Sequence, residues 1–299
     1  MDRRKFLASS AAAVMAANMK VSGAESLTHL ASMPNPNGLK VRFLGTGAAD
    51  WKGRDERGEL RRRSSVLLDD RILIDFTSDC FDTLPEGVRP DTIFYTHSHM
   101  DHYDVNAAVE LGVKYVYLSE TWFDKARKEF AAAAAKKGTA TPRLIPLCIA
   151  APVVLGDITI TPCPADHSTS LLMEQTLIYI VEKNSARVLY ATDTACITAT
   201  AASTIGFSRK SQAPVLTGLV MEATNGVDFE LDHRYFSHSS VASVGRTVDV
   251  LTRFGALDTG GKPVYLTHLA RTLHGTQAEL DRTLPSPLKA AFDGLEVVF

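Results

Sequence analysis

The sequence is poor in cysteine. Only Cys80, Cys148, Cys163 and Cys196 occur among its 299 residues, and no two of them have a Cys-x-x-Cys spacing. This excludes a zinc knuckle. Four cysteines could pair in three ways in an oxidising compartment, but we expect free, buried thiols that behave as small hydrophobic residues.

An excess of charge of one sign is also missing, because 32 basic residues face 34 acidic ones and the net charge is -2. Without a broad positive field, we expect no stable nucleic-acid or membrane partner. No repeat with a period of 20 to 50 residues is visible, which excludes solenoids and propellers. With 45% hydrophobic and 22% charged residues, the composition is that of a globular protein with a real core.

The N-terminus has the order of an export signal. The basic stretch 2–7 precedes an Ala-rich run, 8–17, that is too short to span a bilayer, and small residues follow at 22–24. The pair Arg3 and Arg4 resembles a twin-arginine signal, which exports proteins already folded. We therefore predict a periplasmic protein in three parts: a twin-arginine signal peptide (1–24), a linker (25–38) and one folded domain (39–299).

Apolar periodicity predicts an α/β domain. Strands are expected at 39–44, 65–68, 71–76, 92–95, 115–118, 153–155, 158–162, 176–181, 187–191, 215–221, 264–266 and 295–298. Helices are expected at 104–111, 120–137, 239–254 and 276–284.

A dense group of metal-binding residues follows the predicted strand 92–95. His97, His99, Asp101 and His102 lie within six residues, where the strand runs into a loop. Three imidazoles and one carboxylate at such a point can face a common volume, and they are a ligand set that suits Zn²⁺.

Three later residues repeat this placement, because His167, Asp193 and His268 each lie just beyond a predicted strand. Any one of them alone is better explained as a turn residue or a satisfied polar group. Their common position at strand ends favours donors that complete an open, catalytic metal site.

The pattern His-x-His-x-Asp-His, followed by a lone His, a lone Asp and a last His, resembles the ligand set of the metallo-β-lactamase superfamily. The resemblance implies a four-layer αβ/βα sandwich, in which two mixed β-sheets are flanked by helices and two metals lie at one edge. It assigns the ligands as follows: His97, His99 and His167 to the first ion, Asp101, His102 and His268 to the second, and Asp193 to both. Diiron members typically carry a carboxylate where His99 stands, so zinc is favoured, with Mn²⁺ and Fe²⁺ left open.

Other segments are similar to ribonuclease Z and the phosphoribosyl cyclic phosphodiesterases. They are Phe43-Leu44-Gly45-Thr46-Gly47, Arg63-Ser64-Ser65, Leu73-Ile74-Asp75, Glu222-Ala223-Thr224 and His238-Ser239-Ser240. In ribonuclease Z-like enzymes a Glu and a His at the last two motifs form a proton-relay pair, which implies that role for Glu222 and His238. The chain lacks the basic, Gly-rich arm with which ribonuclease Z grips transfer RNA, so the resemblance does not carry over a natural substrate.

The loop 51–63 is basic in a nearly neutral chain. It could hold an anionic substrate near the metals, with Arg63 as the candidate substrate-binding residue, or it could be a plain solvated loop. The turn Gly45-Thr46-Gly47 is weak evidence for phosphate binding, because glycines are also needed to turn a chain.

These observations lead to the hypothesis of a hydrolase with a dinuclear zinc site that cleaves a small, anionic phosphodiester. A bridging hydroxide is the expected nucleophile, oriented by Asp101, while Glu222 places His238 to protonate the leaving alkoxide. A β-lactamase, lactonase or thioester hydrolase of the same superfamily is the alternative, and a noncatalytic metal-binding protein is a third. The expected partners are the substrate and the twin-arginine machinery, and a homodimer stays open.

Overall fold

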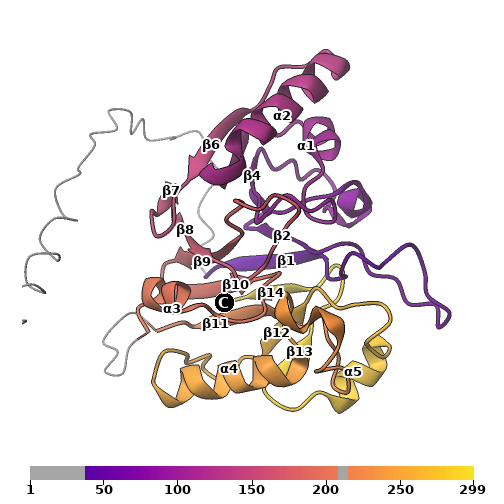
Figure 1. Cartoon of the computed structure of the whole chain (residues 1–299), viewed down its shortest axis with the longest axis vertical. Coiled ribbons are helices and arrows are strands. Elements are labelled where there is room, and N and C mark those ends of the chain that lie inside the picture. Colours follow the sequence, from indigo (N-terminus) through magenta and orange to yellow (C-terminus); the bar gives the residue numbers. More distant parts are fainter. Residues whose placement is uncertain (1–37, 208–214) are drawn as a thin grey trace, which may run out of the picture. The chain divides into compact units, whose positions relative to one another are not determined.

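The computed structural model describes residues 38–207 and 215–299 (Figure 1). The expected signal peptide and nearly all of the linker lie outside the described residues, so those boundaries stay predictions. Within the described ranges, no helix is both long and apolar enough to cross a membrane.

The described part of the chain forms two seven-stranded sheets. The first has the order β14-β1-β2-β3-β4-β5-β6, with strands Glu296–Val298, Lys40–Gly45, Ser65–Leu68, Ile72–Ile74, Thr92–Phe94, Tyr115–Ser119 and Arg143–Leu147. The second has the order β13-β12-β11-β10-β9-β8-β7, with strands Leu288–Ala290, Val264–Thr267, Gly218–Glu222, Ala186–Ala191, Leu177–Lys183, Ile158–Pro164 and Val153–Leu155. Both sheets mix antiparallel and parallel pairs.

Helices cover the outer face of each sheet (Figure 1). The α-helices are α1 (Val105–Leu111), α2 (Phe123–Lys137), α3 (Ala199–Ile205), α4 (Val241–Arg253) and α5 (Gln277–Thr283), and short 3₁₀ helices occupy Ser78–Thr83, Glu120–Trp122 and His233–Phe236. Buried residues of α1 and α2 form one core with the first sheet, and those of α3, α4 and α5 form another with the second. Between the sheets, Phe94 stacks on Tyr117 and meets Tyr179 edge-on. These layers confirm the predicted four-layer sandwich.

The topology places several strand ends at one edge. In the second sheet β10, β11 and β12 are parallel, and β8 runs in the same direction because two antiparallel pairings separate it from β10. The carboxyl ends of β8, β10 and β12 therefore share an edge, and each is followed by one of the expected metal ligands. In the first sheet, β4 leads directly into the loop that contains His97 and His102.

Besides the 3₁₀ helices Ser78–Thr83 and His233–Phe236, two strands and one α-helix were missing from the prediction: β6, β13 and α3. β6 contains Pro146, which weakens a strand pattern but is tolerated here because β6 is an edge strand. α3 has only seven residues, of which Ala201 and Ile205 alone are buried, so it shows no sustained apolar period.

The four cysteines are free thiols, as expected. Cys80 and Cys163 are buried, but Cys148 and Cys196 are exposed. The expectation of burial is wrong for these last two, which lie in loops at the surface.

Candidate metal centre

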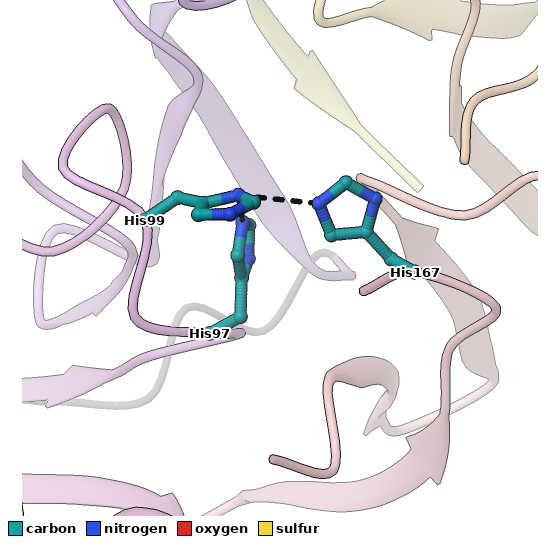
Figure 2. A group of neighbouring side chains, drawn as sticks. All are labelled: His97, His99 and His167. Carbon is teal, nitrogen blue, oxygen red and sulfur yellow. Dashed lines mark hydrogen bonds between the residues drawn. The ribbon is translucent and has the colours of Figure 1, made fainter. Parts of the chain in front are cut away.

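The first group of donors consists of His97, His99 and His167 (Figure 2). Nδ1 of His99 lies 3.0 Å from Nε2 of His97 and 3.2 Å from Nε2 of His167. His97 and His99 come from the loop after β4, whereas His167 comes from the segment after β8. Three imidazole nitrogens from two sheets thus converge on one point.

The second group consists of Asp101, His102 and His268, with Asp193 beside it. Nε2 of His102 lies 3.0 Å, and Nε2 of His268 3.3 Å, from the same carboxylate oxygen of Asp193. The other oxygen of Asp193 lies 3.8 Å from Nε2 of His167, a member of the first group. Asp193 therefore stands between the two groups.

The backbone is strained at three positions around this centre. Asp75, Asp193 and His268 have φ angles of 55°, 49° and 53°. Non-glycine residues rarely adopt this left-handed region, and such strain persists where the surrounding structure enforces it, often at functional sites. Two of the three residues are predicted metal ligands, and the third supports ligands.

Asp75 fixes the orientation of two histidines. Its buried carboxylate accepts hydrogen bonds from the Thr96 amide (2.8 Å), the Thr96 hydroxyl (2.7 Å) and Nδ1 of His102 (2.8 Å). Because the Thr96 hydroxyl donates to Asp75, it accepts from Nδ1 of His97 at 2.9 Å. Both imidazoles therefore carry the proton on Nδ1 and present Nε2 to the centre, the arrangement that metal-binding histidines need.

Glu222 supports His268 in the same way. The Thr224 hydroxyl donates to the Glu222 carboxylate and accepts from Nδ1 of His268 at 2.8 Å. Nδ1 of His167 donates to the Ser237 carbonyl at 2.9 Å. The sequence singled out Glu222 but not this function of it, and it gave no role to Asp75.

The donors fit divalent cations. Burial holds the pKa of His97 well below its ordinary value, so its imidazole is neutral and can act as a ligand. Burial alone would also lower the pKa of His102, but Asp193, Asp101 and Asp75 together raise it well above the ordinary value. Nε2 of His102 is buried and lies 3.0 Å from Asp193 and 3.4 Å from Asp101, although it meets hydrogen-bond geometry with no described residue. Carboxylates clustered in this way around a buried ring nitrogen favour a positive charge at this point.

His238 and Glu222 form the expected pair beside these donors. Oε1 of the buried Glu222 lies 3.0 Å from Nδ1 of His238 and also accepts from the Thr194 amide at 2.7 Å. Burial opposes a charged imidazole, but the Glu222 carboxylate outweighs it and raises the pKa of His238 to about 9. His238 also lies 3.8 Å from Asp193. A protonated imidazole can therefore stand next to the metal ligands.

A cavity of about 210 Å³ opens onto the centre. It is lined by Ala48, Ala49, Asp50, His99, Asp101, Asp193, Thr224, Arg234, His238, His268 and Ala270. Arg234, on the short 3₁₀ helix His233–Phe236, is the one Lys or Arg in this lining. One of its terminal nitrogens is buried without a hydrogen-bond partner among the described residues. Sequence analysis missed Arg234, because a single arginine in an aperiodic loop carries no pattern.

The structure does not bring Arg63 into this cavity. Arg63 lines a larger one, of about 740 Å³, with Ser98, Met100 and Tyr103. Two other arginines of the basic loop have structural roles. The buried guanidinium of Arg61 donates hydrogen bonds to the Thr46 hydroxyl and the Ala291 carbonyl, and Arg62 forms an ion pair with Asp82. Lys52, Arg54 and Arg57 are exposed to solvent, and no residue of the loop lines the metal cavity.

The glycines of the turn 45–47 serve close packing. A Cβ on Gly45 would lie 1.9 Å from the Arg63 carbonyl, and one on Gly47 would lie 2.5 Å from the Trp51 ring. These glycines let the basic loop pack against the end of β1, and no phosphate-binding role is needed to explain them.

Residues 70–269 match the family model described as the beta-lactamase superfamily domain. Among solved structures, a diphosphatase of the PhnP family is 23% identical with a TM-score of 0.60, over 87% of this chain and 98% of that one. Zn²⁺-bound PqqB from Methylobacterium extorquens is 15% identical with a TM-score of 0.63, over 87% of this chain and 100% of that one. A long-form RNase Z from yeast is 14% identical with a TM-score of 0.55, over 88% of this chain and 42% of that one. No curated protein sequence matches the chain.

Proposed function

The chain belongs to the beta-lactamase superfamily, and from this premise we propose that it is a phosphodiesterase with two zinc ions at the centre described above. The observation that carries the proposal is the hydrogen bond between His238 and Glu222 beside the donor groups. An alkyl alcohol leaving a phosphodiester is strongly basic and needs a proton as its bond to phosphorus breaks. A thioester depends less on such a donor, because a thiolate is a better leaving group than an alkoxide.

His97, His99 and His167 would hold one ion, Asp101, His102 and His268 the other, and Asp193 both. When bound, two such ions supply a nucleophilic hydroxide at neutral pH and Lewis acidity toward phosphoryl oxygens. Asp101 and Asp193 would orient the attacking oxygen, and His238 would donate its proton to the departing oxygen. Glu222 would keep His238 charged and in place.

Arg234 would bind the phosphoryl group. A guanidinium nitrogen without a partner in the metal cavity is costly to bury, and a phosphoryl oxygen is a strong acceptor for it. A fixed cation here favours an anionic substrate over a neutral ester or lactam. The names of two structural neighbours, a diphosphatase and an RNase Z, agree with chemistry at phosphorus.

Metal content and a substrate screen test the proposal directly. We expect two zinc equivalents per chain, and loss of the first ion in the double variant His97→Ala plus His167→Ala. The enzyme should hydrolyse bis(p-nitrophenyl) phosphate in preference to nitrocefin or a lactone. Absence of metal, or hydrolysis of the carbonyl substrates alone, would refute the phosphodiesterase proposal.

The proton donor is tested by varying the leaving group. His238→Ala should lower kcat by about 10² to 10⁴ on a phosphodiester with an alkyl leaving group, but much less on a nitrophenyl ester, because nitrophenolate leaves without a proton. His233→Ala is the matched control, since the side chain of His233 is 79% exposed on the neighbouring 3₁₀ helix. Equal losses on both substrates with zinc retained would show that His238 is not the donor. Glu222→Gln is a less clean variant, because Glu222 also supports His268 through Thr224.

A further inference from the structure

A second cavity, of about 340 Å³, lies next to the metal cavity and shares His238 with it. Its lining includes Asn225, Tyr235, Phe236, Cys196 and Arg246. None of these residues is among the expected metal ligands or the proposed proton-transfer pair. The two cavities therefore adjoin at His238.

The side chains of this second cavity include two exposed aromatic rings. Phe236 is 85% and Tyr235 52% exposed, and their rings meet edge-on with centroids 5.2 Å apart. Both follow Arg234 directly on the 3₁₀ helix His233–Phe236. Large aromatic surfaces bordering a small cavity offer a stacking and edge-contact surface for another ring.

Polar groups without partners accompany the rings. Arg246, an exposed residue of α4, adds a guanidinium to the lining. Asn225 is fully buried, and neither the nitrogen nor the oxygen of its side-chain amide has a hydrogen-bond partner in the described ranges. Unsatisfied buried amides are rare in folded proteins, and a polar ligand atom can satisfy them. The cavity thus combines an aromatic rim with free polar groups, as small-molecule sites do.

We propose that this cavity is the binding site for the leaving group, and that the leaving group is an alcohol carrying a planar ring. The proposal rests on the proposed function, in which His238 protonates the departing oxygen. A proton donor must contact that oxygen, so the group attached to it extends past His238, away from the phosphoryl group. The cavity on that side of His238 is the one bordered by Tyr235 and Phe236.

Paired substrates test the activity side of this proposal. Methyl 2-phenylethyl phosphate and ethyl methyl phosphate release primary alcohols of similar acidity, and chromatography of the alcohols shows which bond is cleaved. We expect kcat/KM to favour release of 2-phenylethanol over ethanol by about tenfold, and Phe236→Ala to remove most of that preference. Leu231→Ala is the control, because Leu231 is 92% exposed in the same segment but does not line the cavity. An equal preference in the parent protein and in Phe236→Ala would overturn the proposal.

Thiol labelling tests the cavity without relying on catalysis. Cys196 lines the cavity and is exposed, whereas Cys148 is exposed outside it. We expect methyl 2-phenylethyl phosphate to slow alkylation of Cys196 several-fold at pH 9, with no change at Cys148 and with weaker protection in Phe236→Ala. Protection without any phosphodiester hydrolysis would leave the ring site standing and refute the proposed function. Hydrolysis with Cys196 unprotected would refute the ring site alone.

Discussion

Replacing Asp75 by Asn should weaken metal binding although Asp75 is not itself a ligand. The carboxylate accepts three hydrogen bonds, from the Thr96 amide, the Thr96 hydroxyl and Nδ1 of His102. An amide of the same shape has one oxygen and one NH₂ group, so at least one of these donors would face another donor. If the NH₂ group faces His102, it cannot accept the proton on Nδ1. The imidazole then keeps Nε2 unprotonated for the metal only if it gives up the hydrogen bond between Nδ1 and residue 75 that orients it. If it faces the Thr96 amide, a buried N–H is left unsatisfied.

The expected magnitude is a 10- to 100-fold loss of metal affinity, which is the usual effect of removing a group that orients a metal-binding histidine. The Thr96 hydroxyl also fixes His97, so both ions should be affected. Zinc affinity is measured by competition with a chromophoric chelator. The control is Asp70→Asn, because Asp70 also has a left-handed backbone (φ 56°) but its side chain pairs with Lys40 at the surface. Unchanged affinity for both ions in Asp75→Asn would refute the argument that Asp75 sets the tautomers.

Three further expectations concern export, pH and packing. Arg3→Lys with Arg4→Lys should abolish appearance of the protein in the periplasm; normal periplasmic amounts would refute the twin-arginine assignment. Burial lowers the pKa of His274 to about 4 from an ordinary value of 6.5. The unfolded chain therefore binds a proton that the folded one cannot as the pH falls from 6.5 to 4. The parent protein should lose about 2 to 3 kcal/mol more unfolding free energy between pH 7.5 and 4 than His274→Gln, in urea titrations at each pH. Gly45→Ala should cost about 1 to 3 kcal/mol of unfolding free energy, because its Cβ would strike the Arg63 carbonyl. The control is Gly245→Ala on α4, where a Cβ meets nothing within 4 Å and the substitution should stabilise the protein slightly. An unchanged unfolding free energy in Gly45→Ala would contradict the packing argument.

The cluster of donors was largely predictable, because each donor lies just after a strand and that position can be read from the sequence. His97, His167 and His268 lie just past strands whose apolar character is plain in the sequence, and the structure brings them together. Asp75 could not be assigned a role from sequence, because its function depends on a left-handed backbone and on contact with His102, 27 residues away. Arg234 was missed because only the folded chain places its 3₁₀ helix beside the metal-binding residues.

The secondary structure was likewise predictable in some elements and not in others. Strands with continuous apolar runs were predicted close to their observed bounds, as for β2 and β7. β6 was missed because Pro146 interrupts its strand pattern, and α3 because seven residues with two buried side chains are too few to show an apolar period. The sequence left the role of the basic loop open, because charge counted along the chain does not reveal that Arg61 is buried against Thr46 or that Arg62 pairs with Asp82 at the surface.

The division of the donors between the two sheets has a kinetic consequence. His97, His99, Asp101 and His102 follow a strand of the first sheet, whereas His167, Asp193 and His268 follow strands of the second. Each ion would therefore be a cross-link between the two sheets, and opening of the sheets at this edge would remove ligands from it. The exchange rate of zinc against an isotopic tracer should then rise when the sandwich opens there more often. Substitutions between the sheets, such as Phe94→Leu or Tyr179→Phe, should speed that exchange while leaving every ligand in place.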